Sequence, residues 1–168
     1  MISQKICKGD TNMKRIITAT MAAIILVLAF AGCGGSSVDL KKVMTDVNAK
    51  YSDATGGLKE LKEVADLDKY YSIAEKDVKQ FAAEINPDTS SAPVEIVLVE
   101  AVDKTASDSV KKALDARYQS IYSTYSSYSA DQVELVKKCK VTQNGNFVTL
   151  VVASDYDGIM EIVNNAIK

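Results

Sequence analysis

Residues 135–153 read LVKKCKVTQNGNFVTLVVA, and this stretch decides the fold of the chain. Two runs of strand-like residues, Leu135–Thr142 and Asn146–Ala153, flank the pair Asn144-Gly145. An Asn-Gly pair between strand patterns favours a two-residue type I′ turn, because both central residues of that turn need positive φ. We therefore predict an antiparallel hairpin that turns at Asn144 and Gly145, with one mainly apolar face against helices. The predicted facing pairs are Val141–Val148, Cys139–Leu150 and Lys137–Val152.

Upstream of the hairpin, the apolar pattern predicts helices and one strand. Val94–Val102 is an apolar run rich in β-branched residues, which is typical of a buried strand. Residues 58–71 are polar and weakly periodic, with room for one short helix. Helical periodicity predicts three longer helices, at 39–52, 74–85 and 105–127.

Short polar residues mark where the predicted helices begin. Ser37 or Asp39 is available as the N-cap of the first helix, and Ser107 as the N-cap of the longest one. Ser154 and Asp157 form a pattern like a capping box at the start of a last helix. The predicted buried stripe of this last helix is Ile159, Ile162, Val163 and Ile167.

These elements predict an α+β fold with about three strands in a mainly antiparallel sheet and helices packed on one face. Residues 39–168 have the length of a single globular domain with one core. The composition is ordinary for a globular protein, with 47% hydrophobic and 25% charged residues, but histidine is absent. Without histidine, Ser-His-Asp and Cys-His nucleophile systems and imidazole metal sites are excluded. We predict no catalytic residue, no metal site and no cofactor.

The first part of the chain reads as a secretory signal that is cleaved. The basic pair Lys14-Arg15 precedes an apolar run over residues 16–31. This run is shorter than the roughly 20 residues that a membrane-spanning helix needs. It ends in Phe30-Ala31-Gly32-Cys33, which resembles the bacterial lipobox, with Phe30 where an aliphatic residue is usual. In that motif the cysteine receives a diacylglyceryl group, and the peptide bond before it is cut.

We expect Cys33 to carry fatty acyl chains such as palmitate and to anchor the chain to the membrane. Residues 33–38 are then the lipidated cysteine and a flexible Gly/Ser tether. Each buried methylene contributes about 0.8 kcal/mol, so two or three acyl chains hold a protein on a bilayer. The alternative is an uncleaved signal anchor, but no basic cluster follows the apolar run. Residues 1–12 fit no signal design, so we predict that residues 1–32 are an upstream extension plus signal peptide, with Met13 as the true start.

The charge and the cysteine content of the chain limit the kinds of partner and the disulfide bonds that we expect. The chain has 20 basic and 22 acidic side chains, and removal of residues 1–32 makes it more acidic. Its lysines are scattered, so we predict no nucleic-acid binding. With Cys7 discarded and Cys33 lipidated, Cys139 has no partner for an intramolecular disulfide. We interpret Cys139 as a buried, inert thiol on the inward face of the hairpin.

Four short segments carry a resemblance to a known family. They are Val38-Asp39-Leu40, Tyr71-Ser72-Ile73, Glu95-Ile96 and Gly145-Asn146-Phe147-Val148. In their order and spacing, from about Val38 to Ile167, they are similar to small Gram-positive lipoproteins that carry the domain of unknown function 4358. The Tyr- and Ser-rich end of the long predicted helix departs from that family, which more often places a proline after an aromatic residue. The resemblance supplies no activity and no catalytic residue.

The predicted long helix has a row of tyrosines near its end. Tyr118, Tyr122, Tyr125 and Tyr128 share one broad helical face. Tyr118 and Tyr125 fit half-buried core positions with their hydroxyls at the rim. We expect Tyr122 and Tyr128 to stay exposed and to form a contact surface, because exposed aromatic rings stack on sugars or dock a partner.

The acidic residues assemble no recognisable site in the sequence. Glu95 and Glu100 lie on opposite faces of the predicted strand, roughly 17 Å apart, too far for the carboxylate pair of a glycoside hydrolase. We expect Glu95 to be solvated or paired with a lysine. Asp155-Tyr156-Asp157-Gly158 superficially resembles a calcium loop, but its glycine comes too early for that motif, so helix capping explains these carboxylates better.

The sequence therefore favours a lipoprotein on the extracytoplasmic face of the cell membrane. We expect its domain to bind or scaffold a protein or another ligand of the cell envelope, without enzymatic activity. One alternative is an envelope enzyme, or a subunit of one, that uses Asp or Glu acid–base chemistry. Another is a small lipoprotein that captures a solute, although the chain is too short for the usual two-lobed binding protein.

Overall fold

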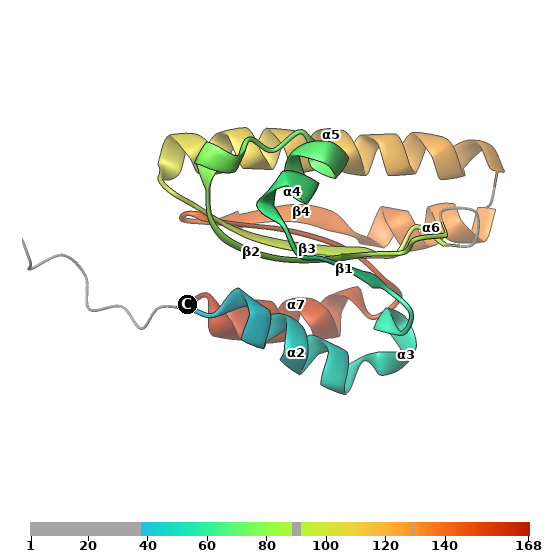
Figure 1. Cartoon of the computed structure of the whole chain (residues 1–168). Helices are drawn as coiled ribbons and strands as arrows, with labels where there is room; N and C mark the ends of the chain where they lie inside the picture. Colours follow the sequence, from blue (N-terminus) through green and yellow to red (C-terminus); the bar gives the residue numbers. More distant parts are fainter. Residues whose placement is uncertain (1–37, 89–91, 129) are drawn as a thin grey trace, which may run out of the picture. The chain divides into compact units, whose positions relative to one another are not determined.

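A five-stranded antiparallel sheet forms the centre of the computed structural model, which describes residues 38–88, 92–128 and 130–168 (Figure 1). The strand order is β1-β2-β3-β5-β4, and every neighbouring pair is antiparallel. The strands are β1 (Lys59–Leu61), β2 (Val78–Ile85), β3 (Glu95–Ala101), β4 (Lys140–Asn144) and β5 (Phe147–Val152). The predicted α+β class and the antiparallel sheet are confirmed. The predicted signal segment and Cys33 lie outside the described residues.

Helices cover both faces of the sheet, not one face as the sequence predicted (Figure 1). One face carries α4 (Val64–Tyr71) and α5 (Lys104–Tyr128), and the other carries α2 (Leu40–Lys50) and α7 (Tyr156–Ala166). Two further helices are α3 (Ser52–Thr55) and α6 (Ala130–Lys138), of which α6 packs against α5. The cause is β3, in which every residue is buried, because a strand with apolar residues on both sides needs cover on both faces.

The sheet has five strands, not about three, because two segments without a predicted strand form β1 and β2. Residues 74–85, predicted as a helix, form a short 3-10 turn (Glu75–Asp77) and then β2. The apolar residues of this segment fit a helical period, but hydrogen bonding along the whole of β3 decides in favour of a strand. β1 is a three-residue edge strand that begins with two exposed charged residues, so it lacks an apolar alternation to detect.

The predicted hairpin is present, but its turn lies one residue later. Asn144 pairs with Phe147, so the turn residues are Gly145 and Asn146. Gly145 has φ +58° and Asn146 does not have positive φ, which is the pattern of a type II′ turn rather than type I′. The new register moves each partner by two residues and therefore keeps every side chain on its expected face. Val141 thus faces Leu150, not Val148.

The first half of the predicted hairpin strand is helical. Residues 135–138 belong to α6, and β4 begins only at Lys140. Cys139 lies at the junction and is buried, with its thiol 3.3 Å from the Leu135 carbonyl oxygen, to which it donates. Burial raises the pKa of the Cys139 thiol. The prediction of a buried thiol is therefore confirmed, although the residue lies beside a strand rather than within one.

The helix starts agree with the sequence at one of three places. Asp39 caps α2, because its carboxylate accepts from the amides of Lys41 and Lys42. In α5 the capping carboxylate is Asp103, which accepts from the Ala106 amide at 2.8 Å, so Ser107 is not the N-cap. Ser107 instead is buried in the first turn and donates to the Gly145 carbonyl oxygen at 3.0 Å.

The last helix has no side-chain cap of the predicted kind. Asp155 is the N-cap residue of α7, and the Ser154 hydroxyl donates to its carboxylate at 3.1 Å instead of closing a capping box. Ile159, Val163 and Ile167 are buried as predicted, whereas Ile162 is only partly buried.

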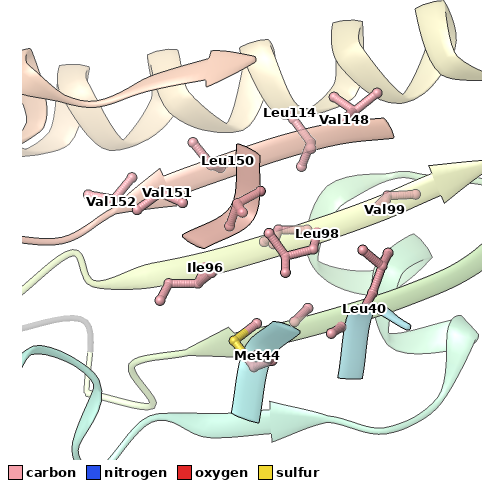
Figure 2. Close-up of a cluster of buried hydrophobic side chains, with 14 of the residues drawn as sticks. Leu40, Met44, Ile96, Leu98, Val99, Leu114, Val148, Leu150, Val151 and Val152 are labelled. Atoms are coloured by element: carbon pink, nitrogen blue, oxygen red, sulfur yellow. The ribbon is translucent and has the colours of Figure 1, made fainter. Parts of the chain in front are cut away.

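Two hydrophobic layers hold the elements together. Val148 and Leu150 of β5 lie on the face covered by α5, where Leu114 packs (Figure 2). Leu40 and Met44 of α2 approach the opposite face of the sheet, near Ile96 and Leu98 of β3 (Figure 2). These side chains are almost fully excluded from water, so β3 is the common wall of both layers.

Both ends of the unit Val38–Lys168 are fixed near the hairpin end of the sheet. The Gln80 side-chain amide donates to the Val38 carbonyl oxygen at 2.6 Å and to the Glu100 carboxylate at 2.5 Å. Asn144 donates to the Ile167 carbonyl oxygen at 3.1 Å. Figure 1 accordingly shows the start of α2 beside the C-terminus. Within the described part of the chain, no helix has the length and hydrophobicity to cross a membrane.

Close packing between Tyr51, which follows α2, and Gly158 of α7 generates a test of this arrangement. A Cβ atom placed on Gly158 would overlap the Tyr51 hydroxyl and lie 2.6 Å from ring atom Cζ. Gly158→Ala should therefore lower the free energy of unfolding by about 1 kcal/mol, since overpacking outweighs the gain in helix propensity. Urea denaturation followed by circular dichroism measures this change.

The control is the same substitution in a Tyr51→Ala background. With the ring removed, Gly158→Ala should raise the free energy of unfolding by about 0.5–1 kcal/mol, because only the helix propensity effect remains. An equal loss of stability in both backgrounds would contradict the packing described here.

Candidate functional site

A cavity of about 260 Å³ opens at the end of the sheet where β3 begins. The segment leading into β3 contributes Pro93, Val94 and Glu95, and α5 contributes Arg117, Ser120 and Ile121. We call this space the Glu95 cavity. Polar and apolar side chains line it about equally, so a ligand in this cavity meets both hydrogen-bonding groups and apolar walls.

A buried ion pair forms the polar wall of the Glu95 cavity. Arg117 Nε donates to both carboxylate oxygens of Glu95 at 3.1 Å, and Arg117 Nη2 donates to Oε2 at 2.7 Å. The Glu95 side chain is only 3% exposed, whereas the Arg117 side chain is 30% exposed. The carboxylate therefore lies below the guanidinium, and solvent reaches the pair mainly through Arg117.

Two features of its surroundings have opposite effects on the pKa of Glu95. Burial raises the pKa of the Glu95 carboxyl, and the hydrogen bonds and charge of Arg117 oppose that rise. Because both carboxylate oxygens accept from Arg117, Glu95 is held as an anion in a fixed orientation. It is therefore a positioning group for Arg117 rather than a proton donor to the cavity.

Tyr71, at the end of α4, stacks near the same pair. Its ring centroid lies 5.8 Å from Arg117 Cζ, within the range of a cation–π interaction. The Tyr71 hydroxyl is buried and has no hydrogen-bond partner among the described residues. Burial raises the pKa of Tyr71 well above its usual range, so the hydroxyl stays neutral. The guanidinium is thus restrained by a carboxylate and by an aromatic ring.

The two glutamates of β3 lie on opposite faces, as the sequence predicted, but Glu95 does not have the predicted surroundings. It is buried and paired with an arginine, not solvated or paired with a lysine. Glu100, at the other end of β3, is also buried and accepts from Lys79 Nζ at 2.6 Å. A carboxylate pair for glycoside cleavage is thereby excluded, because Glu95 and Glu100 have separate partners on separate faces.

The predicted tyrosine surface on α5 is only partly described. Tyr122 is half-buried against the hydrophobic core, so its ring is less exposed than expected. Tyr118 and Tyr125 are half-buried as well, and the Tyr118 hydroxyl donates to the Val136 carbonyl oxygen at 3.2 Å. The side chain of Tyr128 lies outside the described residues. A contact surface made by Tyr122 and Tyr128 stays a prediction.

No cluster of three or more His, Cys, Asp or Glu side chains that could hold a metal occurs in the described ranges. Asp155 and Asp157 lie at the start of α7, and both are exposed. Their position at a helix N-terminus agrees with a role in helix stabilisation rather than in a calcium loop.

A second cavity, of about 210 Å³, lies between α2 and β2. Glu84 and Glu60, which are paired across β1 and β2, both line it, and Asn48 Nδ2 donates to Glu84 Oε1 at 2.8 Å. Burial raises the pKa of Glu84, and the charge of Glu60 adds to the rise. This cavity lacks the fixed guanidinium of the Glu95 cavity, so we take the Glu95 cavity as the candidate functional site.

The comparison with protein families agrees with the resemblance in the sequence. A family model described as Domain of unknown function (DUF4358) matches residues 50–153. The chain belongs to this family. The matched residues include all five strands of the DUF4358 sheet and both members of the Glu95–Arg117 pair. No curated protein and no solved structure matches the chain.

Some of the DUF4358 residues that form the candidate site were missed in the sequence. The sequence predicts no role in a site for Arg117 or Tyr71, and it predicts that Glu95 is solvated or paired with a lysine. One signal was available: Arg117 is the only arginine after Cys33, in a chain that otherwise uses lysine. Arginine is favoured over lysine where a planar, bidentate contact with a carboxylate is needed.

The buried pair generates a prediction about stability and its pH dependence. Arg117→Leu should lower the free energy of unfolding by about 3 kcal/mol at pH 7.5, since it leaves an uncompensated buried carboxylate. Burial raises the pKa of Glu95, so a protonated carboxyl is compatible with the folded state. This loss of unfolding free energy should therefore become smaller as the pH falls toward about 4.3, the ordinary pKa of a glutamate carboxyl. Urea denaturation at pH 7.5 and pH 4.5 measures both effects.

The matched control replaces both partners. Glu95→Leu/Arg117→Leu should have a free energy of unfolding within about 1 kcal/mol of the unsubstituted protein, since an apolar pair of similar volume substitutes for a buried ion pair. A single Arg117→Leu variant that is fully stable at pH 7.5 would show that Glu95 does not depend on Arg117.

Proposed function

We propose that this DUF4358 protein is a lipoprotein on the extracytoplasmic face of the cell membrane, whose domain binds a ligand or partner of the cell envelope. One observation carries the proposal: the sequence Phe30-Ala31-Gly32-Cys33 ends an apolar run, and the compact unit begins at Val38, only five residues after Cys33. A short Gly/Ser segment thus joins the lipid attachment site to the folded unit.

The position of Val38 supports a binding role for the Glu95 cavity. Val38 is fixed by Gln80 and is therefore next to Glu100, at one end of β3. The Glu95 cavity lies at the other end of β3, roughly 17 Å away at about 3.4 Å per residue. Five residues from Cys33 to Val38 span at most about 18 Å. Anchoring at Cys33 keeps Val38 within about 18 Å of the anchor, whereas the cavity is lined by residues at the other end of β3.

An acid–base enzyme is the second candidate, and one observation favours it. Glu95 is a buried carboxyl with a raised pKa, and it lines a cavity. However, its two oxygens accept three hydrogen bonds from Arg117. A general acid must present its proton to the substrate, so a carboxylate occupied in this way favours binding over catalysis.

The test of anchoring is the substitution Cys33→Ser in cells that are fed labelled palmitate. An oxygen in place of the sulfur cannot accept the thioether-linked diacylglyceryl group, so the variant should lose the label. Its share in the membrane pellet should also fall, because the acyl chains supply most of the membrane affinity. Both quantities are measured from the same cell fractions.

Cys7→Ser is the matched control, since Cys7 lies in the segment that we expect to be removed. This variant should keep the label and the membrane fraction of the unsubstituted protein. Undiminished labelling and pelleting of Cys33→Ser would refute the anchor.

A further inference from the structure

We infer that the Glu95 cavity is a binding site for a carboxylate-bearing small molecule, with Arg117 as the group that binds the carboxylate. This inference deepens the proposed function and rests on it for the biological setting alone. The chemistry follows from three observations: the hydrogen bonds of the guanidinium, the walls of the cavity and the charge of the ion pair.

The guanidinium has donors left after pairing with Glu95. A guanidinium has five N–H groups in one plane, and the Glu95 carboxylate is held by the edge formed by Nε and Nη2. Nη1 makes no hydrogen bond to the described residues, so its two N–H groups and one N–H of Nη2 are left. One N–H of Nη1 and the remaining N–H of Nη2 form the second edge of the guanidinium, which fits a second carboxylate in the same bidentate way.

The walls of the cavity suit the remainder of a small organic acid. Pro93, Val94 and Ile121 supply apolar surface, while Ser120 and Thr124 supply hydroxyls one helical turn apart on α5. A volume of about 260 Å³ is below that of a typical drug-sized site, so the ligand is a small acid or the last residues of a peptide. The carboxylate binds Arg117, and the apolar part of the ligand lies along Ile121.

The charge of the pair favours a singly charged anion. The Glu95 carboxylate neutralises Arg117 and lies within 3.1 Å of its Nε and Nη2. An anion on the second edge is attracted by Arg117 and repelled by Glu95 behind it. The attraction and the repulsion both scale with the charge of the ligand, so the ion pair leaves only a small net attraction. The cost of removing the ligand from water grows faster than its charge, so a phosphate dianion loses more on entering the cavity than a carboxylate does. The ligand class that fits is therefore a carboxylate.

The position of Arg117 is fixed before any ligand arrives. Glu95 holds one edge of the guanidinium, and the Tyr71 ring lies 5.8 Å from its central carbon. Binding then costs little side-chain entropy, which is the usual advantage of a pre-organised arginine. This arrangement gives Glu95 and Tyr71 a positioning role and leaves ligand contact to Arg117.

The test is isothermal titration calorimetry on the full chain in detergent micelles. Two acids are compared with their neutral amides: benzoate with benzamide, and acetyl-Ala-Ala with acetyl-Ala-Ala-amide. At least one acid should bind at least tenfold more tightly than its amide. Binding of benzoate alone identifies a free acid as the ligand, and binding of the peptide acid identifies a peptide C-terminus; either result supports a carboxylate site. Inorganic phosphate should bind more weakly than the acid that binds.

Variants of α5 connect this binding to the cavity. Ser120→Trp should weaken binding of the acid at least tenfold, because Ser120 lines the cavity and an indole in its place takes up cavity volume. Ser123→Trp is the matched control: Ser123 is an exposed serine on the same helix that does not line the cavity, so binding should be unchanged. Arg117→Lys keeps the positive charge beside Glu95 but loses the planar donors, and it should also weaken binding at least tenfold. Circular dichroism melting curves verify that each variant is folded.

The inference is overturned if neither acid binds better than its amide, or if Ser120→Trp binds the acid as tightly as Ser123→Trp does. Both results are independent of lipid attachment, since the titration uses protein in micelles. A failed titration therefore leaves the anchor at Cys33 standing, and a failed labelling experiment leaves the carboxylate site standing.

Discussion

The burial of β3 on both faces is the constraint on which the rest of the structure depends. Every residue from Glu95 to Ala101 is excluded from water, so α4 and α5 must cover one side and α2 and α7 the other. The two glutamates at the ends of this strand cannot be buried without partners. Alternation places them on opposite faces, and each finds its partner there: Arg117 for Glu95, and Lys79 with Gln80 for Glu100. The same strand thereby fixes the cavity at one end and the first residue of the folded unit at the other.

Much of the secondary structure could be predicted because the signals were local. β3, α2, α5 and the hairpin follow from runs of apolar residues and from one Asn-Gly pair. The segment 74–85 could not be assigned this way, since its apolar positions fit a helix and a strand, and only pairing with β3 separates the two. The cover on both faces was predictable in principle: residues 96–99 are four apolar residues in succession, whereas a strand with one solvated face alternates.

The candidate site was harder to predict than the fold, because its parts lie far apart in the sequence. Glu95 and Arg117 are separated by a strand, a turn and half of a long helix, and their contact depends on how α5 crosses the sheet. Tyr71 comes from a third element, α4. A glutamate at the edge of an apolar run looks like the end of a buried strand, and nothing local shows that the covering helix continues past it. The single arginine after Cys33 was the one clue to a bidentate contact.

The Glu95–Arg117 pair is not explained by stability alone. Two charges taken out of water lose hydration that their mutual attraction only partly restores, and apolar residues of similar volume would serve the fold as well. Apolar residues could not supply a guanidinium held in one orientation. In the pair, Glu95 occupies one edge of the Arg117 guanidinium and leaves the donors of the other edge unused. The pair also differs from the surface ion pairs of this protein, such as Lys42–Asp46, which joins two exposed side chains one helical turn apart. A fixed guanidinium at the edge of a cavity fits the carboxylate site that we propose, because its orientation matters to a molecule that enters the cavity.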